Sequence, residues 1–128
     1  MSRRTPLARA LGAGSAKDGT GHWWAQRVSA VALVPLVLWL ALSLASLAVG
    51  GADYLSAIDW VRVPMNAVLL LLVISAVFYH SHLGVQVVIE DYVHGAFMKV
   101  AALILQKLIH LALAVAGIFA VLRIALGD

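Results

Sequence analysis

Three long apolar runs separated by short polar stretches dominate the chain. They extend from about Val28 to Val49, from about Val63 to Ile89 and from about Val100 to Leu126. At a rise of ~1.5 Å per residue, a helix of any of these lengths can cross a hydrocarbon core of ~30 Å. The pattern therefore predicts an all-α membrane protein with three transmembrane helices in a bundle.

The polar stretches predict where these helices end. Residues 1–26 are expected to form a polar tail that precedes a membrane anchor spanning residues 27–128. "GGADYLSAIDW" is predicted to be a turn, and "EDYVHGAF" a short loop. Pro35 lies inside the first run, where we expect it to kink the helix, and Pro64 falls in the first turn of the second.

Composition supports an integral membrane protein. Of the 128 residues, 63% are hydrophobic and 12% are charged, and a soluble domain of this size could not bury so much apolar surface. The chain has no cysteine, which excludes disulfides, cysteine-ligated iron–sulfur clusters and thiol catalysis within it. The net charge of +3 does not suggest nucleic acid, because the basic residues form no patch with interleaved aromatics.

The distribution of basic residues predicts the topology. With three spans, one side of the membrane receives six of them: Arg3, Arg4, Arg9, Lys17, Arg27 and Lys99. The other side has Arg62 and Arg123. The positive-inside rule then places the N-terminus in the cytoplasm, or on the equivalent matrix side. A cleaved signal peptide does not fit a polar tail this long, and Asp18 disfavours an organellar transit sequence.

The second run carries histidines near its end. At ~100° per residue, His80 and His82 face opposite ways on a helix, whereas Gly84 and Asp91 return to the His80 face. An imidazole beside a glycine gap suits a haem, because the nitrogen binds iron and the missing side chain lets the porphyrin approach. An interhelical hydrogen bond is the alternative for His80, and a polar contact between helices is the expected role of His82.

A six-coordinate haem needs a second axial ligand. His110 in the third run is a candidate, but its position beside Lys107 suggests that it faces a polar seam while Lys107 snorkels toward the headgroups. We therefore expect the second ligand to come from another chain.

Three further residues have both a functional and a structural interpretation. Arg27 is either a topological anchor or the partner of an anionic group such as a haem propionate. Tyr92 could donate a hydrogen bond to a quinone carbonyl, and Asp91 could relay protons to it. Both also suit a solvated helix end.

The segment "HSHLGVQVVIEDYVHG" resembles the H-x-x-x-G-x-x-x-x-x-x-D-Y signature of the small hydrophobic, D-type anchor subunit of succinate dehydrogenase, respiratory complex II. The basic tail, the opening "HWWAQRVSAVALVPL" of the first run and the position of the motif at the end of the second agree with this family. The resemblance covers about residues 20–127.

The resemblance implies roles for individual residues. His80 matches the axial haem b ligand, Arg27 resembles the arginine near the haem propionates, and Tyr92 matches the tyrosine that hydrogen-bonds ubiquinone, with Asp91 beside it. His82 does not match. His22 is close to a family histidine, but its spacing to Arg27 does not establish a match, so it receives no role.

The resemblance also implies the assembly. A cytochrome b anchor subunit would supply the other haem ligand, and electrons from succinate would arrive through a flavoprotein and an iron–sulfur subunit docked on the cytoplasmic side. The chain would thus serve the respiratory chain and the tricarboxylic acid cycle as a subunit of succinate:ubiquinone oxidoreductase in a bacterial inner membrane rather than a mitochondrial one. It would not oxidise succinate alone.

Two alternatives remain at this point. The first is a haem-free structural anchor of a related respiratory complex. The second is a small proton or ion transport subunit with a path lined by His80, His82, Lys107 and His110, although the chain lacks the repeated, broken helices of many transporters.

Overall fold

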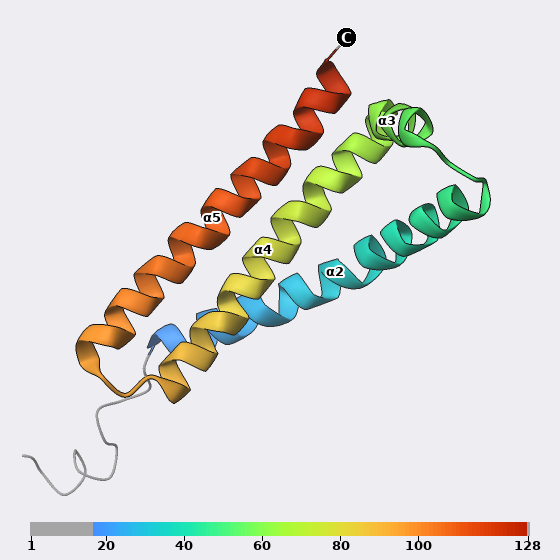
Figure 1. Cartoon of the computed structure of the whole chain (residues 1–128). Helices are drawn as coiled ribbons and strands as arrows, with labels where there is room; N and C mark the ends of the chain where they lie inside the picture. The colour runs from blue at the N-terminus through green and yellow to red at the C-terminus, as the bar shows by residue number, and fades with distance from the viewer. Residues whose placement is uncertain (1–16, 128) are drawn as a thin grey trace, which may run out of the picture.

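The computed structural model describes residues 17–127, and these residues form four helices joined by short connections (Figure 1). The helices are α2 (Lys17–Val49), α3 (Tyr54–Arg62), α4 (Pro64–Tyr92) and α5 (Ala96–Leu126). No strand occurs within this part of the chain. The all-α fold predicted from the sequence is confirmed.

Three of the helices are long and apolar enough to span a membrane, as the sequence predicted. Each extends beyond the expected span: α2 begins at Lys17, inside the predicted tail, α4 continues to Tyr92, and α5 begins at Ala96. A helix of about 30 residues is ~45 Å long and overshoots a ~30 Å hydrocarbon core. Hydropathy finds only the embedded part, because the polar turns beyond it remain helical in water. The loop between α4 and α5 therefore shrinks to residues 93–95.

The predicted turn after the first span was wrong, because most of it is the helix α3. Asp53 caps its N-terminus by accepting hydrogen bonds from the backbone N–H and the hydroxyl of Ser56, a common helix start. The hydroxyl bond is the main cause that lowers the pKa of Asp53. The Trp60 ring stacks on that of Trp39 in α2, with centroids 5.7 Å apart. This contact links α3 to the C-terminal half of α2.

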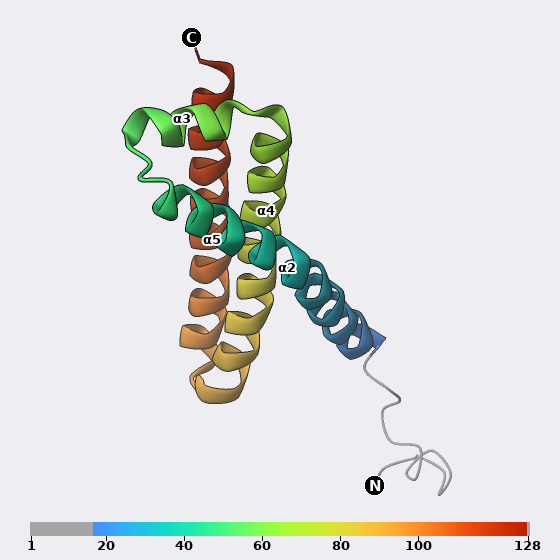
Figure 2. The same ribbon diagram turned by 90° about the vertical axis from the view of Figure 1, so that its right-hand side faces the viewer.

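Helices α4 and α5 run antiparallel and side by side, whereas α2 lies across α4 at an angle (Figures 1 and 2). Close approach of α4 and α5 depends on Gly117, since a Cβ there would lie 3.3 Å from the Ile74 side chain. Arg62 ties α3 to the end of α5 by donating to the carbonyl of Gly127 at 3.0 Å. Residues of α2 and α4 line two hollows where these helices meet.

Candidate functional site: a groove beside His80

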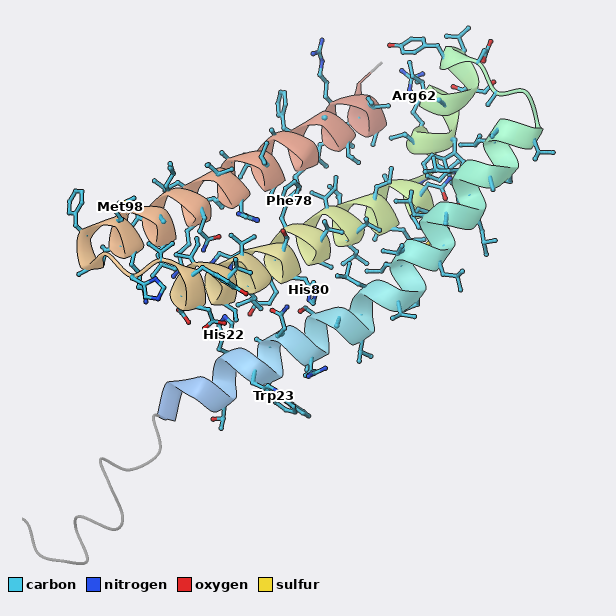
Figure 3. All side chains as sticks on the ribbon, turned by 60° about the horizontal axis from the view of Figure 1, so that its bottom comes forward. His22, Trp23, Arg62, Phe78, His80 and Met98 are labelled. Carbon is cyan, nitrogen blue, oxygen red and sulfur yellow. The ribbon has the colours of Figure 1, made fainter. Side chains whose placement is uncertain are left out.

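His80 points from α4 toward α2, on the opposite side of α4 from Phe78, which lies between α4 and α5 (Figure 3). Its Nδ1 lies 2.9 Å from Oγ of Ser29 in α2. Within residues 17–127, its other ring nitrogen, Nε2, has no hydrogen-bond partner. The sequence placed His80 on a separate face from His82, and the structure confirms this.

A hollow of about 510 Å³ opens beside His80 at the end of the bundle nearer the N-terminus. Helix α4 contributes His80, Gly84 and Val87, and the sequence had placed His80 and Gly84 on one helix face. Helix α2 contributes five residues: His22, Trp23, Gln26, Arg27 and Ala30. The sequence singled out Arg27, and the structure places it in the same hollow as His80.

Two polar atoms of the side chains that line this hollow are buried and unpaired among the described residues. They are Nε2 of His22 and Oε1 of Gln26. Buried polar atoms without partners cost free energy, so they indicate a missing ligand, partner or water. The guanidinium of Arg27 lies over the Trp23 ring, 5.4 Å from its centroid, and remains exposed. This end of the groove therefore suits an anionic or hydrogen-bonding group.

A second hollow of about 490 Å³ continues from His80 along α2. Apart from His80 its lining is apolar: Ala30, Leu33, Val34, Val37, Leu38 and Ala41. Since His80 and Ala30 border both hollows, the two form one groove with a polar end and an apolar end. We call it the His80 groove.

The His80 groove fits a haem. An imidazole nitrogen is available for iron, Gly84 leaves room beside it, and the apolar hollow suits the macrocycle. Arg27 at the polar end suits the propionates. The side chain of Gln26 lies over Gly84, because a Cβ added at Gly84 would be 3.5 Å from Nε2 of Gln26. Only one face of a haem would be covered, because the groove is open to the outside of this chain.

A separate polar seam lies between α4 and α5, on the other side of α4. His110 contacts Oγ of Ser81 through Nε2 at 3.1 Å and the carbonyl of Gln106 through Nδ1 at 2.7 Å. The ring of His82 meets that of His110 edge-on, with centroids 6.2 Å apart. His110 faces a polar seam as expected, whereas His82 meets α5 only through this edge-on ring contact and makes no hydrogen bond within residues 17–127. Neither residue lines the His80 groove.

Asp91 and Tyr92 lie in the last turn of α4, and Tyr92 is 77% exposed. Because α4 remains helical to Tyr92, Asp91 keeps the His80 face, about three turns away. Neither residue lines the groove. Their assignment to a quinone site remains a prediction.

The sequence analysis missed Ser29 and Gln26. Both lie on the face of α2 that meets α4, and Ser29 is only 7% exposed. Two polar residues three positions apart, at the start of an apolar span, share one helix face. That spacing was the available signal, but it could not identify their partners on α4.

The fold and the groove together define an integral membrane protein of three long apolar helices with an open groove beside a histidine. Residues 1–124 match the model of the succinate dehydrogenase/fumarate reductase transmembrane subunit family. The chain belongs to this family, as a hydrophobic membrane anchor subunit of the succinate dehydrogenase type.

Individual relatives agree along nearly the whole chain. The succinate dehydrogenase hydrophobic membrane anchor subunit of Rickettsia bellii is 37% identical over 118 residues, which are 92% of this chain and 93% of the relative. The subunit of the same name from Paracoccus denitrificans is 32% identical over 123 residues, or 96% and 93%. The succinate dehydrogenase membrane anchor subunit of Reclinomonas americana is 30% identical over 94 residues, or 73% and 78%. No solved structure matches this chain significantly.

Proposed function

We propose that this chain holds one side of haem b in succinate:ubiquinone oxidoreductase and contributes to the ubiquinone site. The observation that carries the proposal is the His80 groove, in which an unpaired imidazole nitrogen, a glycine gap and an exposed arginine border one amphiphilic hollow. A haem bound there would supply reversible one-electron chemistry within the membrane. The second axial ligand would come from a cytochrome b anchor subunit that closes the open side.

The side chains of the groove have distinct tasks in this proposal. His80 offers Nε2 to the iron, while Arg27 meets a propionate by a charge-assisted hydrogen bond. His22 and Gln26 present the buried atoms that lack partners, so they are positioned to bind the polar edge of the same group. The apolar side chains of α2 from Leu33 to Ala41 exclude water from the macrocycle side.

The quinone part of the proposal concerns the end of α4. Tyr92 would donate its phenolic proton in a hydrogen bond to a ubiquinone carbonyl, and this bond would strengthen as negative charge develops on the oxygen during reduction. Asp91 would hold or pass a proton nearby. The exposed position of Tyr92 suits a site shared with neighbouring subunits.

The remaining subunits would be a flavoprotein and an iron–sulfur protein docked on the cytoplasmic face of a bacterial inner membrane. The N-terminus would lie on that face, as the basic residues predict. Succinate oxidation would occur in the flavoprotein, and the clusters that carry its electrons would lie in the iron–sulfur protein, since this chain has no cysteine to hold them.

The proposal is tested by the optical spectrum and haem content of the purified complex with two histidine variants. His80→Ala should remove or alter the low-spin haem signal, whereas His82→Ala, two residues away in the polar seam, should leave it nearly intact. Loss of haem with His82→Ala and not with His80→Ala would overturn the assignment. A wild-type complex without haem would favour the structural anchor instead.

A further inference from the structure

Ser29 carries a buried hydroxyl on an apolar stretch of α2, and this hydroxyl contacts two polar atoms. Its Oγ lies 3.1 Å from the carbonyl oxygen of Gln26 and 2.9 Å from Nδ1 of His80. The residue is 7% exposed, so bulk water does not replace either bond. Loss of either bond would lower the stability of the fold, because a buried polar atom without a partner costs free energy.

A count of protons fixes the direction of the two bonds. A hydroxyl has one hydrogen and two lone pairs, and the Gln26 carbonyl can only accept. Ser29 therefore donates its hydrogen to the Gln26 carbonyl. The bond to His80 then requires that Nδ1 carries a hydrogen and donates it to the Ser29 oxygen. In the neutral imidazole the other nitrogen, Nε2, then carries the lone pair. This is the nitrogen that lacks a partner among the described residues.

We propose that Ser29 is a positioning residue that accepts the Nδ1–H of His80, and thereby holds the ring in the tautomer and orientation that bind iron through Nε2. This inference rests on the proposed function of the His80 groove and adds Ser29 to it. Metal-binding histidines commonly donate their second ring N–H to such an acceptor, which also raises the basicity of the ligating nitrogen.

The bond has a consequence for the haem potential. A more basic ligand favours the ferric form, which carries the higher charge on iron. Removing the acceptor should therefore favour the ferrous form and raise the midpoint potential. We expect the ratio of reduced to oxidised haem at a fixed potential to rise about threefold to tenfold, or roughly 30 to 60 mV for a one-electron couple.

Ser29→Ala removes the acceptor and is tested in the purified complex with its partner subunits. The readouts are a potentiometric titration of the haem and the low-spin ferric electron paramagnetic resonance signal. Ser29→Thr keeps a hydroxyl and should restore both. Ser29→Cys has a similar size but a weak acceptor, so it carries the test should the alanine variant not assemble.

Ser46→Ala is the matched control. Ser46 lies on the same helix and makes the same type of bond, to the carbonyl three residues earlier at 2.8 Å, but contacts no histidine. Its loss should leave the potential unchanged.

The outcomes separate this inference from the function on which it rests. A raised potential and altered resonance in Ser29→Ala or Ser29→Cys, reversed in Ser29→Thr, would support it. A haem that is present and dependent on His80, but unchanged in the Ala and Cys variants, would overturn the role of Ser29 alone. An equal shift in the Thr variant would also overturn it, because packing rather than the hydroxyl would then be responsible. Absence of haem from the wild-type complex would overturn both.

Discussion

Gly84 offers a sharp test of the groove, because its substitution should affect the fold and the haem in opposite ways. A Cβ built there meets only Nε2 of Gln26, at 3.5 Å, which is an ordinary van der Waals distance. Alanine also forms helices better than glycine, by up to about 1 kcal/mol in water. Gly84→Ala should therefore leave the bundle as stable as before, or slightly more stable.

The haem should respond in the opposite direction. A methyl group at residue 84 enters the groove beside His80, where a porphyrin would lie against the backbone. Overpacking a closely fitted site costs about 1–3 kcal/mol, which corresponds to a fall in haem affinity of roughly fivefold to 150-fold at ~1.4 kcal/mol per tenfold. Gly84→Leu fills more of the groove and should abolish binding.

The assay measures haem per complex by pyridine haemochrome, together with the thermal stability of the assembled subunits in detergent. Gly117 provides a matched glycine on the other seam. A Cβ there lies 3.3 Å from Ile74, so Gly117→Ala should reduce stability and leave the haem spectrum unchanged. Gly84→Ala should thus lower haem content without lowering thermal stability, and Gly117→Ala should lower thermal stability without lowering haem content.

A full complement of haem with an unchanged spectrum in Gly84→Leu would refute the reasoning, because no porphyrin could then lie over this glycine. Loss of assembly in Gly84→Ala with the haem fully retained would refute it in another way, since this chain provides no clash to explain that loss.

Three other predictions address the ends of the helices. Tyr92→Phe keeps the ring and removes the hydrogen-bond donor, so quinone reduction should fall about tenfold, equivalent to ~1.4 kcal/mol of transition-state stabilisation. Haem content, and succinate oxidation with an artificial acceptor at the flavoprotein, should persist. Unchanged quinone turnover and inhibitor binding would contradict this prediction. Arg62→Gln removes a charged donor to the carbonyls at the end of α5. The free energy of unfolding should fall by about 1 kcal/mol, which is seen as a lower melting temperature. An unchanged melting temperature would mean that this exposed bond contributes nothing to stability. A reporter enzyme that works only outside the cytoplasm should be active at the C-terminus and silent after Gly95, and the reverse would overturn the topology.

The three spans could be predicted from the sequence because hydropathy is a local property. Each apolar run must be helical in a membrane, where the backbone has to satisfy its own hydrogen bonds. The same reasoning failed at α3, whose residues 54–62 are less apolar and do not need to cross the membrane. There the N-terminal cap at Asp53 and the contact between Trp39 and Trp60 decide the structure.

The candidate site was predictable on one helix and not on the other. Helical periodicity was enough to place His80 and Gly84 on one face of α4 and His82 on the opposite face. Ser29 and Gln26 could not be assigned to that site, because their contacts depend on where α2 crosses α4. No periodicity within one helix determines that crossing, which brings together residues 51 positions apart.

The two faces of α4 explain why it can carry several polar residues inside a membrane. Toward α5, Ser81 bonds His110, whose other nitrogen bonds a backbone carbonyl in α5. Both ring nitrogens of His110 are thus paired within the chain, whereas the side-chain amide of the buried Gln106 in α5 has no partner among residues 17–127. Toward α2, His80 has one nitrogen bonded to Ser29, while atoms of His22 and Gln26 remain buried without partners in the described part of the chain. Buried polar atoms without partners therefore occur on both sides of α4 among the described residues, but on the α2 side they border the His80 groove together with Gly84 and Arg27, and that is the side on which we place the haem.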